Sequence, residues 1–172
     1  MTAKLLISVF GDDRPGIVQR LSEVVRNQGG NWLESRLSHL GGKFAGLILA
    51  EFPADAIDVA CNQLNTLSEL TLDIRAELLA DDGTSSKQRI DIEIIGNDKI
   101  GIIHEITDTL SRSLVNVEAL DSQIEAAPMS GGDIFRANIV AGMPESTDIA
   151  DIQEALESIA ADLMVELTIR SS

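Results

Sequence analysis

The spacing of hydrophobic residues in the first half of the chain alternates between the period of a strand and the period of a helix. Short apolar or alternating runs, typical of strands, are separated by glycines and by stretches in which apolar residues recur every three or four positions. The pattern predicts a strand over 5–10, a helix over 17–25, strands over 32–40 and 44–52, a helix over 57–64 and a strand over 70–77. The predicted order is βαββαβ.

The second half of the chain repeats this pattern. Residues 5–18 align with residues 90–103, and at the same offset Asn31 falls on Asn116. Matches farther along the chain need larger offsets, which predicts insertions between the strands of the second copy. Such self-similarity indicates that one structural unit occurs twice.

Two βαββαβ copies predict an α+β protein with two tandem ferredoxin-like units, each with an antiparallel sheet that both helices cover on one face. The first unit is expected over 1–80, a linker of small polar residues over 81–88 and the second unit over 89–172. In the second unit, the hairpin should turn near 130–132 and the last strand should span 163–169.

Charge and composition exclude several classes of function. The chain has 13 Lys and Arg against 28 Asp and Glu, a net charge of −15, and most of the excess lies in the second half. Nucleic-acid phosphates would be repelled by this surface, and an aromatic content of 3% without tyrosine leaves little for bases to stack on. We therefore expect no direct nucleic-acid partner.

The distribution of apolar residues also bears on location. No stretch approaches the roughly 20 apolar residues that span a bilayer, and the first apolar run is too short for a signal sequence. We therefore expect a cytoplasmic protein with no membrane partner.

Residues 11–17, Gly-Asp-Asp-Arg-Pro-Gly-Ile, are the strongest local signal for chemistry. They predict a turn from strand to helix, with proline at the helix start and glycine where the backbone must be approachable. In a structural interpretation, Asp12 or Asp13 caps the helix and Gly16 lets it pack on the sheet. In a functional interpretation, the free amides of the helix bind an anion such as an amino-acid carboxylate, and an aspartate holds the ammonium group.

The sequence Gly-Asp-Asp-Arg-Pro-Gly-Ile-Val, followed by Gly-Gly-Asn-Trp, resembles the opening of an ACT domain, a small βαββαβ amino-acid sensor, and the likeness covers both halves. Two such domains with little else, together with residues 31–37 and 42–46, are similar to the glycine cleavage system transcriptional repressor family. The resemblance implies a non-enzymatic protein that holds a separate DNA-binding activator in a glycine-responsive way. No cofactor is expected.

The resemblance also implies where a ligand binds, because ACT ligands generally sit between two domains against the first strand-to-helix loop. The residues of the first copy that match this position are Asp12, Asp13, Arg14, Pro15, Gly16, Ile17 and Asn31. Those of the second copy are Asn97, Asp98, Gly101, Ile102 and Asn116. Asn31 and Asn116 each open a strand, where asparagine has either a structural role or an amide to offer a ligand.

The second copy departs from the family pattern at two places. It has Ile100 where the first copy has a proline, and Leu114-Val115 where the first copy has two glycines. We therefore expect the second copy to serve association rather than ligand binding.

The remaining reactive side chains form no recognisable site. His39, His104 and Cys61 lie on different predicted elements without the spacing of metal ligands, so neither a metal site nor a catalytic site is predicted. The acidic residues on or beside the last helix form either a solvated face or a docking surface for a basic partner.

Two functions remain open from the sequence. The first is an amino-acid-responsive regulator, glycine being the leading ligand, that acts by contact with a DNA-binding activator. The alternative is an ACT regulatory subunit of an amino-acid biosynthetic enzyme. The sequence also leaves open whether the chain forms a homo-oligomer. It does not decide whether the two units pair within one chain or between chains.

Overall fold

The structure, a computed structural model, describes residues 1–68, 72–79, 88–126 and 132–171. The chain divides into two compact units, Met1–Gly83 (unit 1) and Thr84–Ser172 (unit 2). Unit 1 contains β1 (Thr2–Asp12), α1 (Ile17–Asn27), β2 (Asn31–Leu40), β3 (Lys43–Pro53), the short 3₁₀ helix η1 (Ala54–Ala56), α2 (Ile57–Ser68) and β4 (Leu72–Leu78). Unit 2 contains β5 (Gln88–Asn97), α3 (Ile102–Arg112), β6 (Asn116–Ala126), β7 (Asp133–Met143), α4 (Ile149–Leu163) and β8 (Val165–Ser171).

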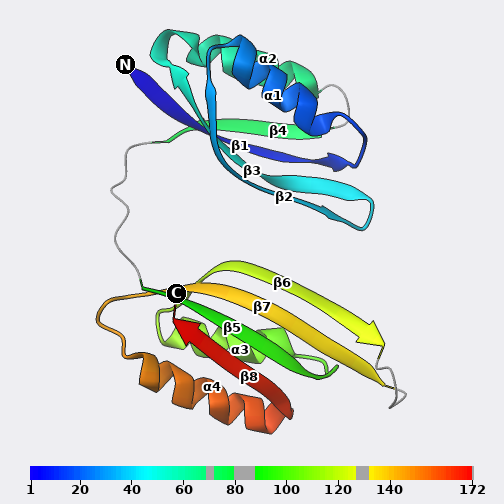
Figure 1. Ribbon diagram of the computed structural model, residues 1–172, viewed down its shortest axis with the longest axis vertical. Coiled ribbons are helices and arrows are strands. Elements are labelled where there is room, and N and C mark those ends of the chain that lie inside the picture. The colour runs from blue at the N-terminus through cyan, green and yellow to red at the C-terminus, as the bar shows by residue number, and fades with distance from the viewer. Residues whose placement is uncertain (69–71, 80–87, 127–131, 172) are drawn as a thin grey trace. The chain divides into compact units, whose positions relative to one another are not determined.

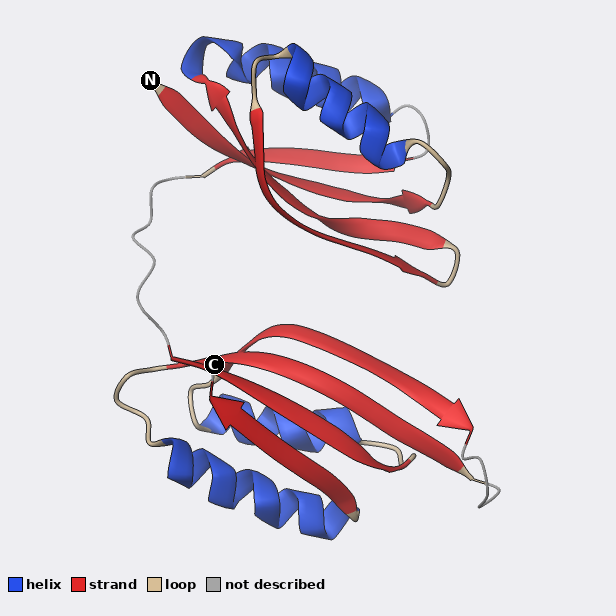
Figure 2. Ribbon diagram, viewed as in Figure 1, coloured by secondary structure: helices blue, strands red, loops and turns tan. Residues whose placement is uncertain are grey.

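Each unit is an antiparallel sheet with both helices on one face (Figure 1). The strand order is β2-β3-β1-β4 in unit 1 and β6-β7-β5-β8 in unit 2, so the first strand of each unit lies in the interior of its sheet. Figure 2 shows the resulting two-layer arrangement of helices and strands in each unit. The predicted α+β fold with tandem βαββαβ units is confirmed.

The alternation of apolar residues decides which face of each sheet is buried. In β1, the side chains of Leu5, Ile7 and Val9 are buried under the helices, while the residues between them face the other side. Apolar residues of α1 and α2 at helical spacing complete the core of unit 1. Among the described residues, no polar or charged side chain is buried in either core.

Some boundaries differ from the predictions for physical reasons. β1 extends beyond the apolar run at both ends because it pairs along its whole length with β3, from Thr2 opposite Pro53 to Asp12 opposite Lys43. The strand predicted from residue 163 begins at Val165, because α4 continues through residue 163 and ends at Met164 in a left-handed conformation (φ 57°).

Two predicted features lie mainly outside the described residues. The linker over 81–88 is described only at Gln88, which begins β5, and the hairpin turn near 130–132 only at Gly132. No helix in the described ranges is long and apolar enough to cross a membrane.

Candidate functional site in the first unit

The turn between β1 and α1 has a backbone that requires glycine at one position. Gly16 precedes the helix with φ 94° and ψ 0°, in the left-handed region. A Cβ atom placed on Gly16 would meet no atom within 4 Å, so backbone conformation and not close packing selects glycine here. The predicted role of Gly16 in packing the helix on the sheet is therefore wrong.

The two aspartates of the turn contact the β2–β3 hairpin. The amide nitrogen of Asp13 donates to the carbonyl oxygen of Gly42 at 3.0 Å. The Asp13 carboxylate lies 2.5 Å from Nδ1 of His39, and the Lys43 ammonium donates to Oδ1 of Asp12. No side chain of the described residues caps α1, so the prediction that Asp12 or Asp13 caps the helix is wrong. Both carboxylates pair with residues that are distant in sequence.

The pairing with Lys43 sets the charge state of Asp12. The hydrogen bond from the Lys43 ammonium, its positive charge and the more distant charge of Arg14 lower the pKa of Asp12 below its ordinary value of 3.8. Asp12 is therefore a carboxylate at neutral pH, and one of its oxygens is already engaged.

A pocket of about 190 Å³ opens beside this turn, between the start of α1, the end of α2 and the start of β4. It is smaller than the ~300–1,000 Å³ typical of sites for drug-sized ligands, so it suits a metabolite of a few heavy atoms. The residues that line it are Asp12, Arg14, Pro15, Ile17, Arg20, Leu21, Leu67 and Leu72.

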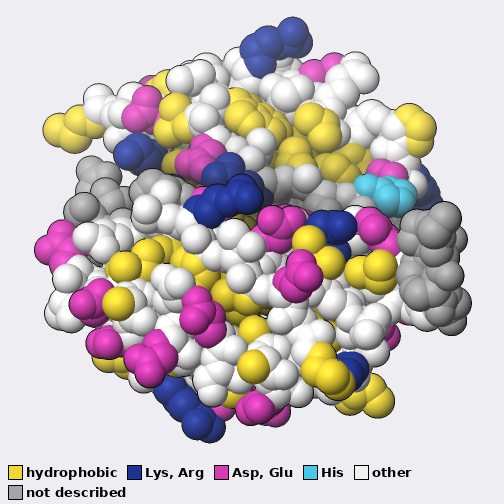
Figure 3. Space-filling view, turned by 60° about the horizontal axis from the view of Figure 1, so that its bottom comes forward, with side chains coloured by type: hydrophobic (Ala, Val, Ile, Leu, Met, Phe, Trp, Pro, Cys, Tyr) yellow, Lys and Arg dark blue, Asp and Glu magenta, His cyan; other side chains and the backbone are white. Residues whose placement is uncertain are grey.

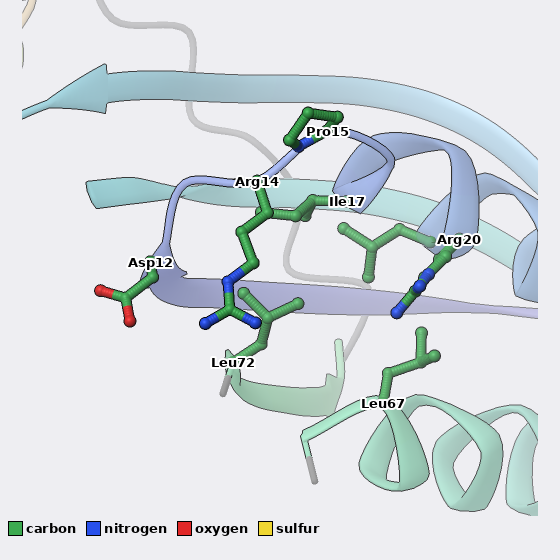
Figure 4. A pocket seen from close by; sticks show the side chains of 8 residues that line it. Asp12, Arg14, Pro15, Ile17, Arg20, Leu67 and Leu72 are labelled. Atoms are coloured by element: carbon green, nitrogen blue, oxygen red, sulfur yellow. The ribbon is translucent and has the colours of Figure 1, made fainter. Parts of the chain in front are cut away.

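The charged groups of the pocket differ in direction (Figure 4). The side chains of Arg14 and Arg20 extend toward Leu72 and Leu67, whereas the carboxylate of Asp12 points away from them. Within the described residues, neither guanidinium group makes a hydrogen bond or an ion pair. Two cationic groups thus face an aliphatic wall, an arrangement suited to a small anion with an apolar part.

The structure brings together only some of the residues predicted for the site. Asp12, Arg14, Pro15 and Ile17 line the pocket, while Asp13 and Gly16 belong to the same turn without lining it.

Asn31 lies at the opposite end of the sheet. It pairs with Glu51 on β3, whereas Asp12 pairs with Lys43 at the other end of that strand. At ~3.4 Å per residue these positions are roughly 27 Å apart. Asn31 therefore has no access to a ligand in the pocket of its own unit.

Sequence reasoning missed four residues of the pocket. Arg20 and Leu21 carried a usable signal, because residues three and four positions after Ile17 share its side of a helix. Leu67 and Leu72 carried none, since only the tertiary fold brings the end of α2 and the start of β4 to this turn.

Comparison with known proteins agrees with this fold. The family model of the ACT domain matches residues 3–77. The match spans most of the first unit. The second unit has the same order of helices and strands, so the chain has two ACT-type folds in tandem.

Relatives of the whole chain extend the comparison. The chain is 27% identical over 169 residues to the glycine cleavage system transcriptional repressors of Escherichia coli (strain K12) and Shigella flexneri, covering 92% of this chain and 85% of each relative. A crystal structure of an unknown protein from Galdieria sulphuraria is 23% identical with a TM-score of 0.87, and the match covers 100% of this chain and 99% of that one.

A second solved structure, described provisionally as a glycine cleavage system transcriptional repressor, is 21% identical with a TM-score of 0.71. That match covers 100% of this chain and 98% of that one. These two structures support the fold across both ACT units.

The corresponding turn in the second ACT unit has the same backbone conformation as the turn in unit 1 but different side chains. Gly101 precedes α3 with φ 98° and ψ −2°, nearly the conformation of Gly16. Asn97 ends β5 opposite Ile134, where unit 1 has an ion pair between Asp12 and Lys43.

At the helix start, Lys99 of the second ACT unit keeps the positive charge of Arg14, but the charge at the position of Arg20 is reversed. At the repeat offset, Glu105 in the first turn of α3 stands where α1 has Arg20. Ile100, in place of Pro15, is fully exposed. A carboxylate that the two arginines of unit 1 attract would be repelled by Glu105, and this supports the predicted difference between the copies.

The other predicted residues of the second ACT unit are separated in the same way as in the first. The amide of Asp98 donates to the carbonyl of Asp133 at 2.9 Å, and Ile102 is buried in the core. Asn116 pairs with Gly142, at the opposite end of the sheet from Asn97.

The remaining reactive side chains stay apart from the pocket. His39 pairs with Asp13, His104 is exposed on α3, and Cys61 is half-buried on α2, where burial and the charge of Asp58 raise the pKa of its thiol. Where the structure describes the chain, no group of His, Cys, Asp and Glu side chains could hold a metal ion.

The last helix carries an exposed acidic face. Asp148 caps α4 by accepting a hydrogen bond from the amide of Ala150 at 2.9 Å. Asp151, Glu154 and Glu157 follow at three-residue spacing and are all exposed. Figure 3 shows acidic side chains spread across the lower half of the view, with few basic ones among them.

Proposed function

We propose that this tandem ACT-domain protein is a non-enzymatic regulator that binds a small amino acid in unit 1 and acts by contact with a DNA-binding activator of glycine cleavage genes. The observation that carries the proposal is the 27% identity, sustained over 92% of the chain, to glycine cleavage system transcriptional repressors. Glycine is the leading ligand for the same reason.

The pocket of unit 1 supports the ligand-binding part of the proposal. Its arginines attract a carboxylate, and its volume of about 190 Å³ accommodates a small metabolite. A ligand changes the behaviour of a regulator only when it binds one arrangement of the protein better than another. The turn that forms the pocket also holds the tip of the β2–β3 hairpin through Asp13 and Lys43, so a ligand here biases both elements.

The charge of the chain supports action through a protein partner. A net charge of −15 disfavours approach to DNA and favours a basic protein surface. The acidic face of α4 is the proposed contact, because Asp151, Glu154 and Glu157 are exposed and share one side of that helix. Charge complementarity of this kind mainly accelerates association and weakens with salt.

Two measurements on the full chain test the proposal. Isothermal titration with each common amino acid at millimolar concentration should give saturable heat for at least one of them, and a complete absence of binding would contradict amino-acid sensing. Affinity purification from cells grown with and without glycine should then recover a DNA-binding activator. Recovery of a biosynthetic enzyme in its place would favour a regulatory subunit.

A further inference from the structure

The pocket of unit 1 holds positive charge without a counter-charge directed into it. Arg14 and Arg20 both line it, and neither forms an ion pair or a side-chain hydrogen bond within the described residues. Unpaired guanidinium groups beside an apolar surface are ready to donate to an oxyanion, because no internal partner has to be displaced.

Among the described residues, no acidic side chain is directed into the same space to bind an ammonium group. The carboxylate of Asp12 is the acidic group that lines the pocket, but it is engaged by Lys43 and points away from Leu67 and Leu72 (Figure 4). Asp13 is held by His39 and does not line the pocket. Among the described residues, the lining therefore offers recognition of a carboxylate and of an aliphatic part, and repulsion of a positive charge.

We propose that the pocket recognises small aliphatic carboxylates through Arg14 and Arg20 and does not recognise the ammonium group, so that 2-oxo acids bind at least as tightly as the corresponding amino acids. This inference rests on the proposed ligand-binding role of unit 1 and names the chemical class to which that site responds. The protein would then respond to the combined concentration of an amino acid and the corresponding 2-oxo acid.

The direction of the preference follows from electrostatics. An amino acid brings its ammonium group close to two guanidinium groups, while a 2-oxo acid carries only the carboxylate charge. Repulsion between two unit charges ~5 Å apart in water corresponds to about a fourfold loss of affinity. We expect the 2-oxo acid of each pair to bind about fourfold more tightly than the amino acid.

The test compares matched ligand pairs on the full chain: glycine with glyoxylate, alanine with pyruvate, and valine with 2-oxoisovalerate. Isothermal titration at neutral pH should show binding of both members of at least one pair, with the 2-oxo acid equal or tighter. If amino acids bind and the 2-oxo acids bind more weakly or not at all, this inference is overturned while the proposed function stands. If neither class binds, both are overturned.

Arginine variants locate the site. Arg20→Gln should weaken both members of a pair about 10- to 150-fold, the range for losing a hydrogen bond to a charged group. Arg26→Gln is the matched control, because Arg26 is exposed on the same helix and does not line the pocket, and it should change affinity less than twofold. Unchanged binding in a folded Arg20→Gln protein, judged by circular dichroism, would overturn the inference.

Discussion

Replacing Gly16 and Gly101 separately by alanine tests whether the two ACT units share a backbone device but differ in ligand binding. The two glycines precede α1 and α3 with φ 94° and φ 98°. At neither position would an added Cβ meet an atom within 4 Å, so the effect comes from backbone strain alone. An L-residue in the left-handed region costs about 1–2 kcal/mol.

The strain should appear as a similar loss of stability in each unit. For a domain of this size, 1 kcal/mol shifts the melting temperature by roughly 4–8 °C. Trp32, the single tryptophan of the chain, packs against the core of unit 1 and reports the unfolding of that unit by fluorescence. Circular dichroism reports both units, so urea titrations followed by the two signals separate the effects.

Ligand affinity should respond in only one of the two variants. Gly16→Ala displaces the turn that positions Arg14, and a strain of about 1.4 kcal/mol that is relieved in the free protein and restored in the bound state corresponds to a tenfold loss of affinity. Gly101→Ala should leave the affinity unchanged, because Glu105 makes the second turn unsuited to a carboxylate. Equal loss of binding in both variants would refute the predicted difference in ligand binding between the two units. An unchanged midpoint of urea unfolding in both variants would refute the strain argument.

Three further predictions follow from other contacts. Gly46→Ala should destabilise unit 1 by about 3 kcal/mol or more in urea titration, because a Cβ there would lie 2.1 Å from the carbonyl oxygen of Arg36. The Asp12 carboxyl should titrate with a pKa below 3.8 in NMR, and Lys43→Gln should raise that pKa. Because the folded-state pKa is lowered, the ion pair stabilises the fold at neutral pH, and this contribution is lost as pH falls through the folded-state pKa. Association with the activator, measured by surface plasmon resonance, should slow without loss of amino-acid affinity when lysine replaces three acidic residues of α4: Asp151, Glu154 and Glu157.

For each of these three predictions, the opposite result would contradict the contact from which it is derived. A Gly46→Ala protein as stable as the parent would mean that the β2–β3 hairpin packs differently. Titration of Asp12 at or above 3.8 would mean that Lys43 is not its partner in solution. Unchanged association rates in the α4 variant would place the partner contact elsewhere.

Much of the fold follows from the sequence because local spacing alone determines it. The apolar positions of β1 and α1 have periods of two and about 3.6, which already separate strand from helix and fix the buried face. The internal repeat supported the predicted order of elements, since the second copy independently gives the same order. Boundaries were less accurate, because residues such as Thr2 and Asp12 join β1 through pairing with β3 and not through their own pattern.

The candidate site was predictable only where its residues are adjacent in sequence. The motif identified the turn and, within it, Arg14, Pro15 and Ile17. It gave the wrong role to the aspartates, because their partners Lys43 and His39 come from a hairpin about 30 residues away in the chain, and such pairings depend on sheet register. Leu67 and Leu72 join the pocket for the same reason.

The measurement that tests the central claim most directly is fluorescence anisotropy of labelled glycine cleavage promoter DNA, titrated with the purified chain in the presence and absence of the activator. A regulator that acts by protein contact should leave the free DNA unbound, join the complex only when the activator is present, and do so with an affinity that changes on addition of the amino acid. Binding of the chain to promoter DNA without the activator would contradict the account, because it would show that this acidic chain reads DNA itself.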